Sequence, residues 1–377
     1  MKNLFISDMH EKDADHFTSN LGLYIRRKTD KPFKKMCNVF TNANIIRDDT
    51  SEGLSDEEYF DNISLDYIPV ENYPIKSGKN NIVVERYPRL EPNEPYIFVC
   101  NHTCPEDIET VLNVLDRNSY LVLGSIESLQ YNPEMYLSWL NGMIPFDILD
   151  KKQRKEVLEK MRRVLKSNSI LIFPEGSHNF SPNKLVNNLF DGPVNLALQT
   201  NRKIVVVTMI KDFENNTSYI DVSNPVDMNQ VDVDVDVNLS MPEDIEKQYV
   251  KSLTSLIRDK MATSVYYIMA RHFKQLKREE HQNIEEELRT QKIEYAFEKL
   301  KWNRDVFEAE YLTKKTKPEL EKEEITKCLS DLALDTLMQR GLCGNEWVLD
   351  QIDMENKDVI VRMRRHLEEN KSKILKK

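Results

Sequence analysis

The chain has 377 residues and a formal net charge of −10. This length allows a large hydrophobic core and two or more domains, whereas the acidic balance argues against nucleic acid as a partner. No apolar run approaches the roughly 20 residues of a membrane-spanning helix, so none is predicted.

The five cysteines are odd in number and scattered, which predicts neither a disulfide framework nor a metal site. Residues 1–15 are acidic and broken by charge, which predicts no secretory signal. Both features favour a cytoplasmic, reducing location.

Residues 1–78 are polar and weakly patterned, and we predict that they form an N-terminal extension. Ser55 followed by Glu58 is typical of a capping box at a helix start. Residues 24–35 contain six basic side chains, one acid and interleaved aromatics. Such a cluster could attract an anionic bilayer at about 1 kcal/mol per basic residue. It therefore predicts peripheral contact with the inner face of a membrane, and a solvated loop is the alternative.

The composition turns apolar near residue 80, where we predict that an α/β domain begins and extends over residues 79–240. Short β-branched and aromatic runs predict buried strands at residues 95–100, 120–124, 169–173, 204–209 and 218–222. Apolar residues at helical spacing predict helices at residues 108–115 and 151–166. We expect an α/β fold with a mixed, mostly parallel sheet flanked by helices on both faces.

A histidine and an aspartate bracket the turn between the first of these strands and the helix that follows it. Thr103 is a plausible N-cap for that helix. Five positions separate His102 from Asp107, so the carboxylate could hold one imidazole nitrogen while the other faces a cleft. That arrangement would make His102 a general base oriented by Asp107. The spacing alone is weak evidence, and a hydrogen-bonded structural histidine is the alternative.

Two further motifs occur downstream. Counting Asn-His-x4-Asp as the first motif, the second is Gly-Met-Ile-Pro-Phe-Asp at residues 142–147, and the third is Phe-Pro-Glu-Gly-Ser-His at residues 173–178. Together with Asn-His-x4-Asp at residues 101–107, they resemble in order and spacing the motifs of the glycerolipid acyltransferase family, of the lysophosphatidate acyltransferase type. The resemblance covers roughly residues 80–225.

The resemblance implies an O-acyltransferase that moves a fatty acyl group from a thioester donor, acyl-CoA or acyl carrier protein, to a hydroxyl of a glycerolipid or related polar acceptor. No further cofactor and no metal is implied. Its site residues would be the catalytic pair His102 and Asp107, the acceptor-binding residues Glu175, Gly176, Ser177 and His178, and the second-motif residues Gly142, Phe146 and Asp147.

The chain differs from the family at the positions where basic side chains usually bind the phosphate of the acceptor. Ile148 and His178 stand where arginines are usual, and Phe190 or Asp191 stands where a lysine is common. Since a hydrogen bond to a charged group contributes about 1.5–3 kcal/mol, their loss predicts an acceptor other than an ordinary glycerol phosphate. Compensation by Lys151, Lys152 or Lys184 would keep the usual acceptor.

Three alternatives stay open. The same His102–Asp107 pair could activate water, which would make the protein a thioester or ester hydrolase. Cys104 could act as a covalent nucleophile, although a turn residue is the simpler interpretation. The protein could also bind lipid without catalysis, with its C-terminal part as the working region.

Residues 241–377 are predicted to be helical, beginning with one long helix near Pro242. No recognisable site occurs in residues 270–377. We interpret this region as a helical appendage for packing, homodimer formation or partner contact.

Overall fold

The computed structural model describes residues 24, 41–48, 53–64, 67–104, 106–115, 117–123, 142–145, 151–176, 186–212, 215–231 and 242–272. Its elements, in chain order, are β1 (Ala43–Arg47), α3 (Asp56–Asn62), the short 3-10 helix η2 (Val70–Asn72), β2 (Asn80–Arg86), β3 (Ile97–Cys100), α4 (Asp107–Val114), β4 (Ser119–Leu123), β5 (Met143–Pro145), α7 (Lys151–Val164), β6 (Ser169–Ile172), α8 (Gly192–Thr200), β7 (Ile204–Asp212), β8 (Thr217–Val222) and α9 (Pro242–His272).

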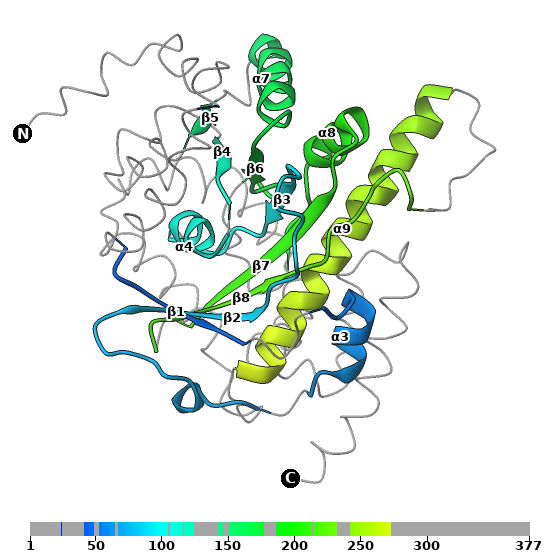
Figure 1. The fold of residues 1–377 in the computed structure, drawn as a ribbon. Helices are drawn as coiled ribbons and strands as arrows, with labels where there is room; N and C mark the ends of the chain where they lie inside the picture. Colours follow the sequence, from blue (N-terminus) through cyan, green and yellow to red (C-terminus); the bar gives the residue numbers. More distant parts are fainter. Residues whose placement is uncertain are drawn as a thin grey trace, which may run out of the picture.

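The described strands form one eight-stranded sheet in the order β1-β2-β8-β7-β3-β6-β4-β5 (Figure 1). Neighbouring described strands run parallel except β7 and β8, which are antiparallel. The predicted mixed, mostly parallel sheet is therefore confirmed. Parallel strands β3 and β6 are direct neighbours, so the segments that leave their carboxyl ends emerge at the same edge of the sheet.

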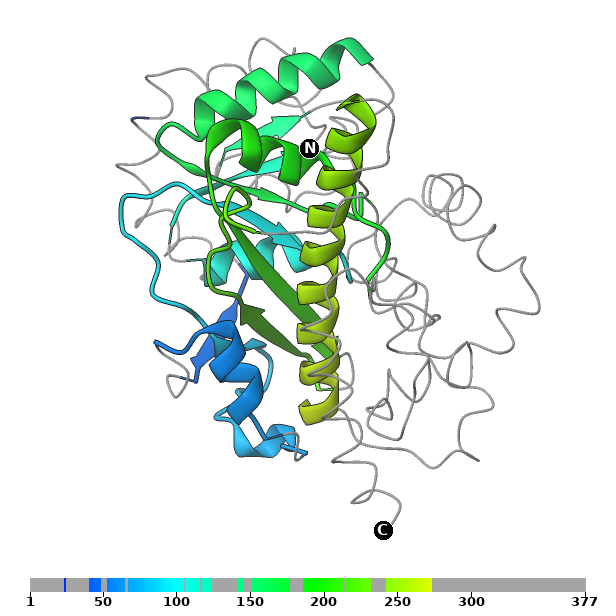
Figure 2. The same ribbon diagram turned by 90° about the vertical axis from the view of Figure 1, so that its right-hand side faces the viewer.

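Alternation along the buried strands divides the core into two layers, because successive side chains point to opposite faces. In β3, Ile97 and Val99 belong to one cluster, and Phe98 and Cys100 belong to the other. The first cluster is covered by α3, α7, α8 and α9, and the second by α4. Figure 2 shows α9 lying lengthwise across its face of the sheet, with α7 and α8 near its upper end in this view. Helices thus flank both faces, as predicted.

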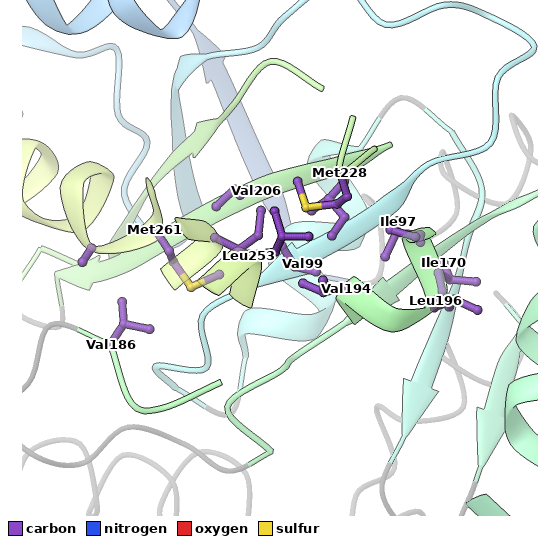
Figure 3. Packing of buried hydrophobic residues seen from close by; sticks show 14 of the residues in the cluster. Ile97, Val99, Ile170, Val186, Val194, Leu196, Val206, Met228, Leu253 and Met261 are labelled. Atoms are coloured by element: carbon purple, nitrogen blue, oxygen red, sulfur yellow. The ribbon is translucent and has the colours of Figure 1, made fainter. Parts of the chain in front are cut away.

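The first layer is shown from close by in Figure 3. Val99 of β3 and Val206 of β7 pack in one cluster with Leu253 and Met261 of α9. Because burying a side chain of this size contributes roughly 1.5–3 kcal/mol, this layer holds α9 firmly on the sheet.

A buried charge network also ties α9 to the sheet. Arg86 of β2, which is 2 % exposed, donates to both carboxylate oxygens of Asp221 at 2.6 and 2.8 Å and to Asp56 of α3 at 2.6 Å. From α9, Lys260 reaches Asp56 at 3.1 Å, and Ser264 donates to Asp221 at 2.6 Å. Both carboxylates of this network, Asp221 and Asp56, therefore have a cationic partner, which offsets the cost of removing them from water.

The sheet and its helices extend past both predicted domain limits. β1 lies within the predicted 1–78 extension and pairs with β2, and α3 begins with the predicted capping box between Ser55 and Glu58. α9 lies within the predicted 241–377 region and covers the sheet. The division at residues 79 and 241 stays a prediction. Residues 24–35, apart from Tyr24, and residues 273–377 lie outside the described residues.

None of the helices that the structure describes combines the length and the apolar character needed to cross a bilayer.

Candidate active site

The segment that follows β3 brings His102 and Asp107 together. His102 Nδ1 lies 2.7 Å from Asp107 Oδ2, and the Asp107 side chain is fully buried whereas 14 % of the His102 side chain is exposed. An ionised carboxylate only accepts hydrogen bonds, so this contact assigns the proton to Nδ1 and the lone pair to Nε2. The ring is thus held in the tautomer that a general base requires.

Asp107 has a second task in the turn that precedes the helix. The same Oδ2 accepts the backbone N–H of Thr103 at 2.9 Å and that of Cys104 at 3.4 Å. α4 begins at Asp107, so the prediction that Thr103 caps the helix is wrong. The N-cap position is Glu106, and the buried hydroxyl of Thr103 has no hydrogen-bond partner among the described residues.

α4 was predicted to have one apolar face, but all eight of its residues are buried. The segment around β1 covers the polar side of the helix: Asn113 donates to Thr41 Oγ1 at 2.8 Å, and Arg47 donates to the carbonyl of Val114 at 3.0 Å. The helix that carries Asp107 is therefore fixed from both sides.

Glu175 reaches the same turn from the end of β6. Its Oε1 accepts the backbone N–H of His102 at 2.7 Å, and its Oε2 accepts the backbone N–H of Asn187 at 2.7 Å. Glu175 is 4 % exposed. The carboxylate therefore joins the segment that carries His102 to the segment that precedes α8, and both its oxygens already hold protein donors. The predicted acceptor-binding role of Glu175 stays a prediction, and the geometry favours a positioning role.

Burial raises the pKa of Glu175 to about 7, while the N–H groups of His102 and Asn187 oppose the rise. Between the ordinary value of 4.5 and about 7, the folded protein holds this proton and the unfolded chain does not. The free energy of unfolding should therefore fall as pH rises through this window.

Glu175→Gln should remove that pH dependence. As pH rises from 4.5 to 7, we expect the unfolding free energy of the wild type to fall relative to that of Glu175→Gln. Denaturant unfolding at each pH measures both values. Parallel pH curves for the two proteins would contradict the assignment of this titration to Glu175.

Gly176 adopts φ +67°, a left-handed conformation that favours glycine. Its predicted acceptor-binding role stays a prediction. A Cβ atom at Gly176 would lie 2.5 Å from Cε2 of Phe190, so the Phe190 ring fills the space beside it. The backbone N–H of Phe190 also donates to the carbonyl of Pro174 at 2.8 Å.

Three further residues shape the site, and the sequence analysis gave them no role. Asn101 continues the ladder between β3 and β7 with its side chain, which donates to the carbonyl of Met209 at 2.9 Å and accepts the N–H of Met209 at 2.8 Å. The ring of Phe173 lies 4.7 Å from the ring of His102, centroid to centroid. Asn187 holds Glu175 as described above. Asn101 and Phe173 belong to the quoted motifs, whereas no sequence signal marks Asn187.

Cys104 is buried in the turn, and burial raises the pKa of its thiol far above the ordinary value. A nucleophilic cysteine needs the thiolate form, which this environment disfavours. We therefore expect Cys104→Ala to keep kcat within about threefold of wild type, because only a small side chain is truncated beside the site. Loss of activity in a folded Cys104→Ala variant, with trapping of an acyl-thioester on the wild type, would instead support the covalent alternative.

The second motif is described only in part. Gly142 adopts φ +101° just before β5 and packs against Tyr120, whose ring atoms would lie 2.7–2.9 Å from an added Cβ. This contact indicates a packing reason for the glycine. Phe146, Asp147, Ile148, Ser177, His178 and Lys184 lie outside the described residues, as do the side chains of Lys151 and Lys152.

Comparison with known proteins gives a family-model match and similar solved structures. The family model described as Acyltransferase matches residues 81–210. A crystal structure of the 1-acyl-sn-glycerophosphate (LPA) acyltransferase PlsC from Thermotoga maritima is similar at 15 % sequence identity, with 67 % of this chain and 85 % of that chain covered and a TM-score of 0.32. No curated protein has a significantly similar sequence. The family match extends from β2 into β7 and includes His102, Asp107 and Glu175.

Proposed function

We propose that the chain transfers a fatty acyl group from a thioester donor to a hydroxyl of a glycerolipid-like acceptor, which the match of residues 81–210 to the family model described as Acyltransferase supports. The donor would be acyl-CoA or acyl carrier protein. The observation that carries the proposal is the 2.7 Å contact between His102 Nδ1 and Asp107 Oδ2 within a site that Glu175 braces.

In the proposed reaction, Nε2 of His102 removes the proton of the acceptor hydroxyl as its oxygen attacks the thioester carbonyl. Asp107 stabilises the imidazolium that forms and keeps the ring oriented. The C–S bond then breaks, and the thiolate leaves with the proton from His102. Both ester formation and thiol release are thus served by one base with a fixed tautomer.

The proposed acceptor differs from an ordinary glycerol phosphate. The family's cationic positions hold Ile148, His178, and Phe190 or Asp191, none of which carries a fixed positive charge. Lys151, Lys152 or Lys184 could supply the missing charge, which would restore the usual acceptor.

The direct test incubates the protein with acyl-CoA and one acceptor class in each of several parallel reactions. The acceptors are lysophosphatidate, glycerol 3-phosphate, lysophospholipids, glycolipids and amino alcohols, and mass spectrometry identifies the products. Acylated product on one acceptor class supports the transferase. Selective turnover of lysophosphatidate would contradict an altered acceptor.

A hydrolase is the second candidate, because the same pair could activate water instead of an alcohol. Free fatty acid released at equal rates with and without acceptor would favour it. A third candidate, lipid binding without catalysis, predicts that His102→Ala leaves the biological effect intact.

Peripheral membrane contact and homodimer formation stay predictions. They rest on residues 24–35 and on the region that follows α9.

A further inference from the structure

One large aromatic side chain is exposed next to the candidate active site. Phe190 is 55 % exposed and is among the few large apolar side chains that the described part of the chain leaves this open to solvent. Its backbone N–H is bound to Pro174, and its ring lies directly against Gly176. An aromatic ring held in place beside a site offers a large apolar surface to a ligand that binds there.

The position of Phe190 is fixed relative to the catalytic pair. Glu175 connects the two regions, since one oxygen holds the N–H of His102 and the other holds the N–H of Asn187, three positions before Phe190. Phe173, two positions before Glu175, packs against the His102 ring. The β6 turn thus presents aromatic surface both beside the base and at Gly176.

The charge around Phe190 is unsuited to a phosphate. The next residue, Asp191, is exposed and acidic. In the described part of this loop, the cation that approaches it is Arg258 of α9, which contacts Asn188 Oδ1 at 3.5 Å. A dianionic phosphate at Phe190 would meet a ring and a carboxylate in place of the lysine common in the family.

We propose that Phe190 is a specificity-determining residue of the acceptor subsite and that the acceptor is a neutral, hydroxyl-bearing lipid whose head group lacks a phosphate. The phenyl ring covers the carbon face of the glycerol or sugar unit and excludes water from it, while His102 acts on the hydroxyl. This inference rests on the proposed acyl transfer and names its acceptor class.

The test compares two acceptors that differ by the phosphate alone, a 1-monoacylglycerol and the lysophosphatidate with the same acyl chain, with acyl-CoA as donor and the full chain as enzyme. Wild type should favour the monoacylglycerol in kcat/KM by about tenfold or more. Phe190→Lys should move the ratio of the two kcat/KM values toward lysophosphatidate by about tenfold, because it restores a cation. Phe190→Leu is the matched control, which keeps an apolar contact and should keep the preference with a raised KM.

The outcomes separate the two proposals. Transfer that favours lysophosphatidate in wild type, or a ratio that Phe190→Lys leaves unchanged, would overturn the role of Phe190 while leaving acyl transfer intact. A folded wild type that transfers acyl groups neither from acyl-CoA nor from acyl carrier protein, to these two acceptors or to any of the panel named above, would overturn both. Because Phe190 is more than half exposed, all variants should melt within a few degrees of wild type, so a change in selectivity reflects the site itself.

Discussion

Replacing His102 with alanine should lower kcat for acyl transfer by about 10²- to 10⁴-fold, the range that a positioned general base contributes. The reason is local, since His102 is the imidazole held by Asp107 in the turn after β3. The His102 ring is partly exposed and belongs to neither core cluster, so its removal should leave the sheet and its two core layers in place. The measurement is steady-state kinetics with acyl-CoA and the preferred acceptor, together with thermal unfolding.

A binding assay for the acyl donor provides the control for this variant. His102→Ala should bind acyl-CoA with nearly wild-type affinity, because only the proton-transfer group is missing. Full acyl-transfer activity in the folded variant would contradict the assignment of His102 as the general base.

Asp107→Asn should lower kcat by about 10²- to 10⁴-fold as well, by a different route. An asparagine whose carbonyl oxygen replaces Oδ2 can still accept the N–H groups of Thr103 and Cys104. It lacks the negative charge that stabilises the imidazolium, and if its amide flips it fixes the wrong tautomer of His102. We therefore expect the loss to appear in kcat, with KM changed little.

Two comparisons make the Asp107→Asn result specific. Asp244→Asn, an equivalent change at an exposed position of α9, should leave kcat unchanged. The double variant His102→Ala/Asp107→Asn should be no slower than His102→Ala alone, because the two residues act as a unit. Additive losses would show that Asp107 acts independently of the histidine.

Local periodicity and residue type were sufficient to predict the main secondary structure around the site. Alternating or continuous apolar runs locate β3, β4, β6, β7 and β8, and helical spacing locates α4, α7 and the start of α9. Capping chemistry located α3 through Ser55 and Glu58. These signals work because side-chain direction repeats every 2.0 or 3.6 residues, which a sequence records directly.

The sequence was also sufficient to predict that the first and third motifs lie close together. Both motifs begin at the ends of buried strands, and neighbouring parallel strands place their carboxyl ends at one edge of the sheet. His102 and Glu175 accordingly meet there, 73 positions apart in the chain.

The role of each group at that edge was decided only by the tertiary structure. Whether the oxygens of Glu175 face a substrate or backbone N–H groups depends on where Asn187 lies. Whether the space beside Gly176 is open depends on Phe190, and whether Thr103 caps α4 depends on the residue at which the helix begins.

The weakly patterned β1 joins the sheet because β2 offers it an unpaired edge, and a polar, half-exposed strand carries no periodic signal of its own. The chain sequence thus determined which elements form and which motifs share an edge. The donors, acceptors and rings that complete the site were settled by contacts between distant segments, because such contacts depend on burial and on three-dimensional position rather than on spacing along the chain.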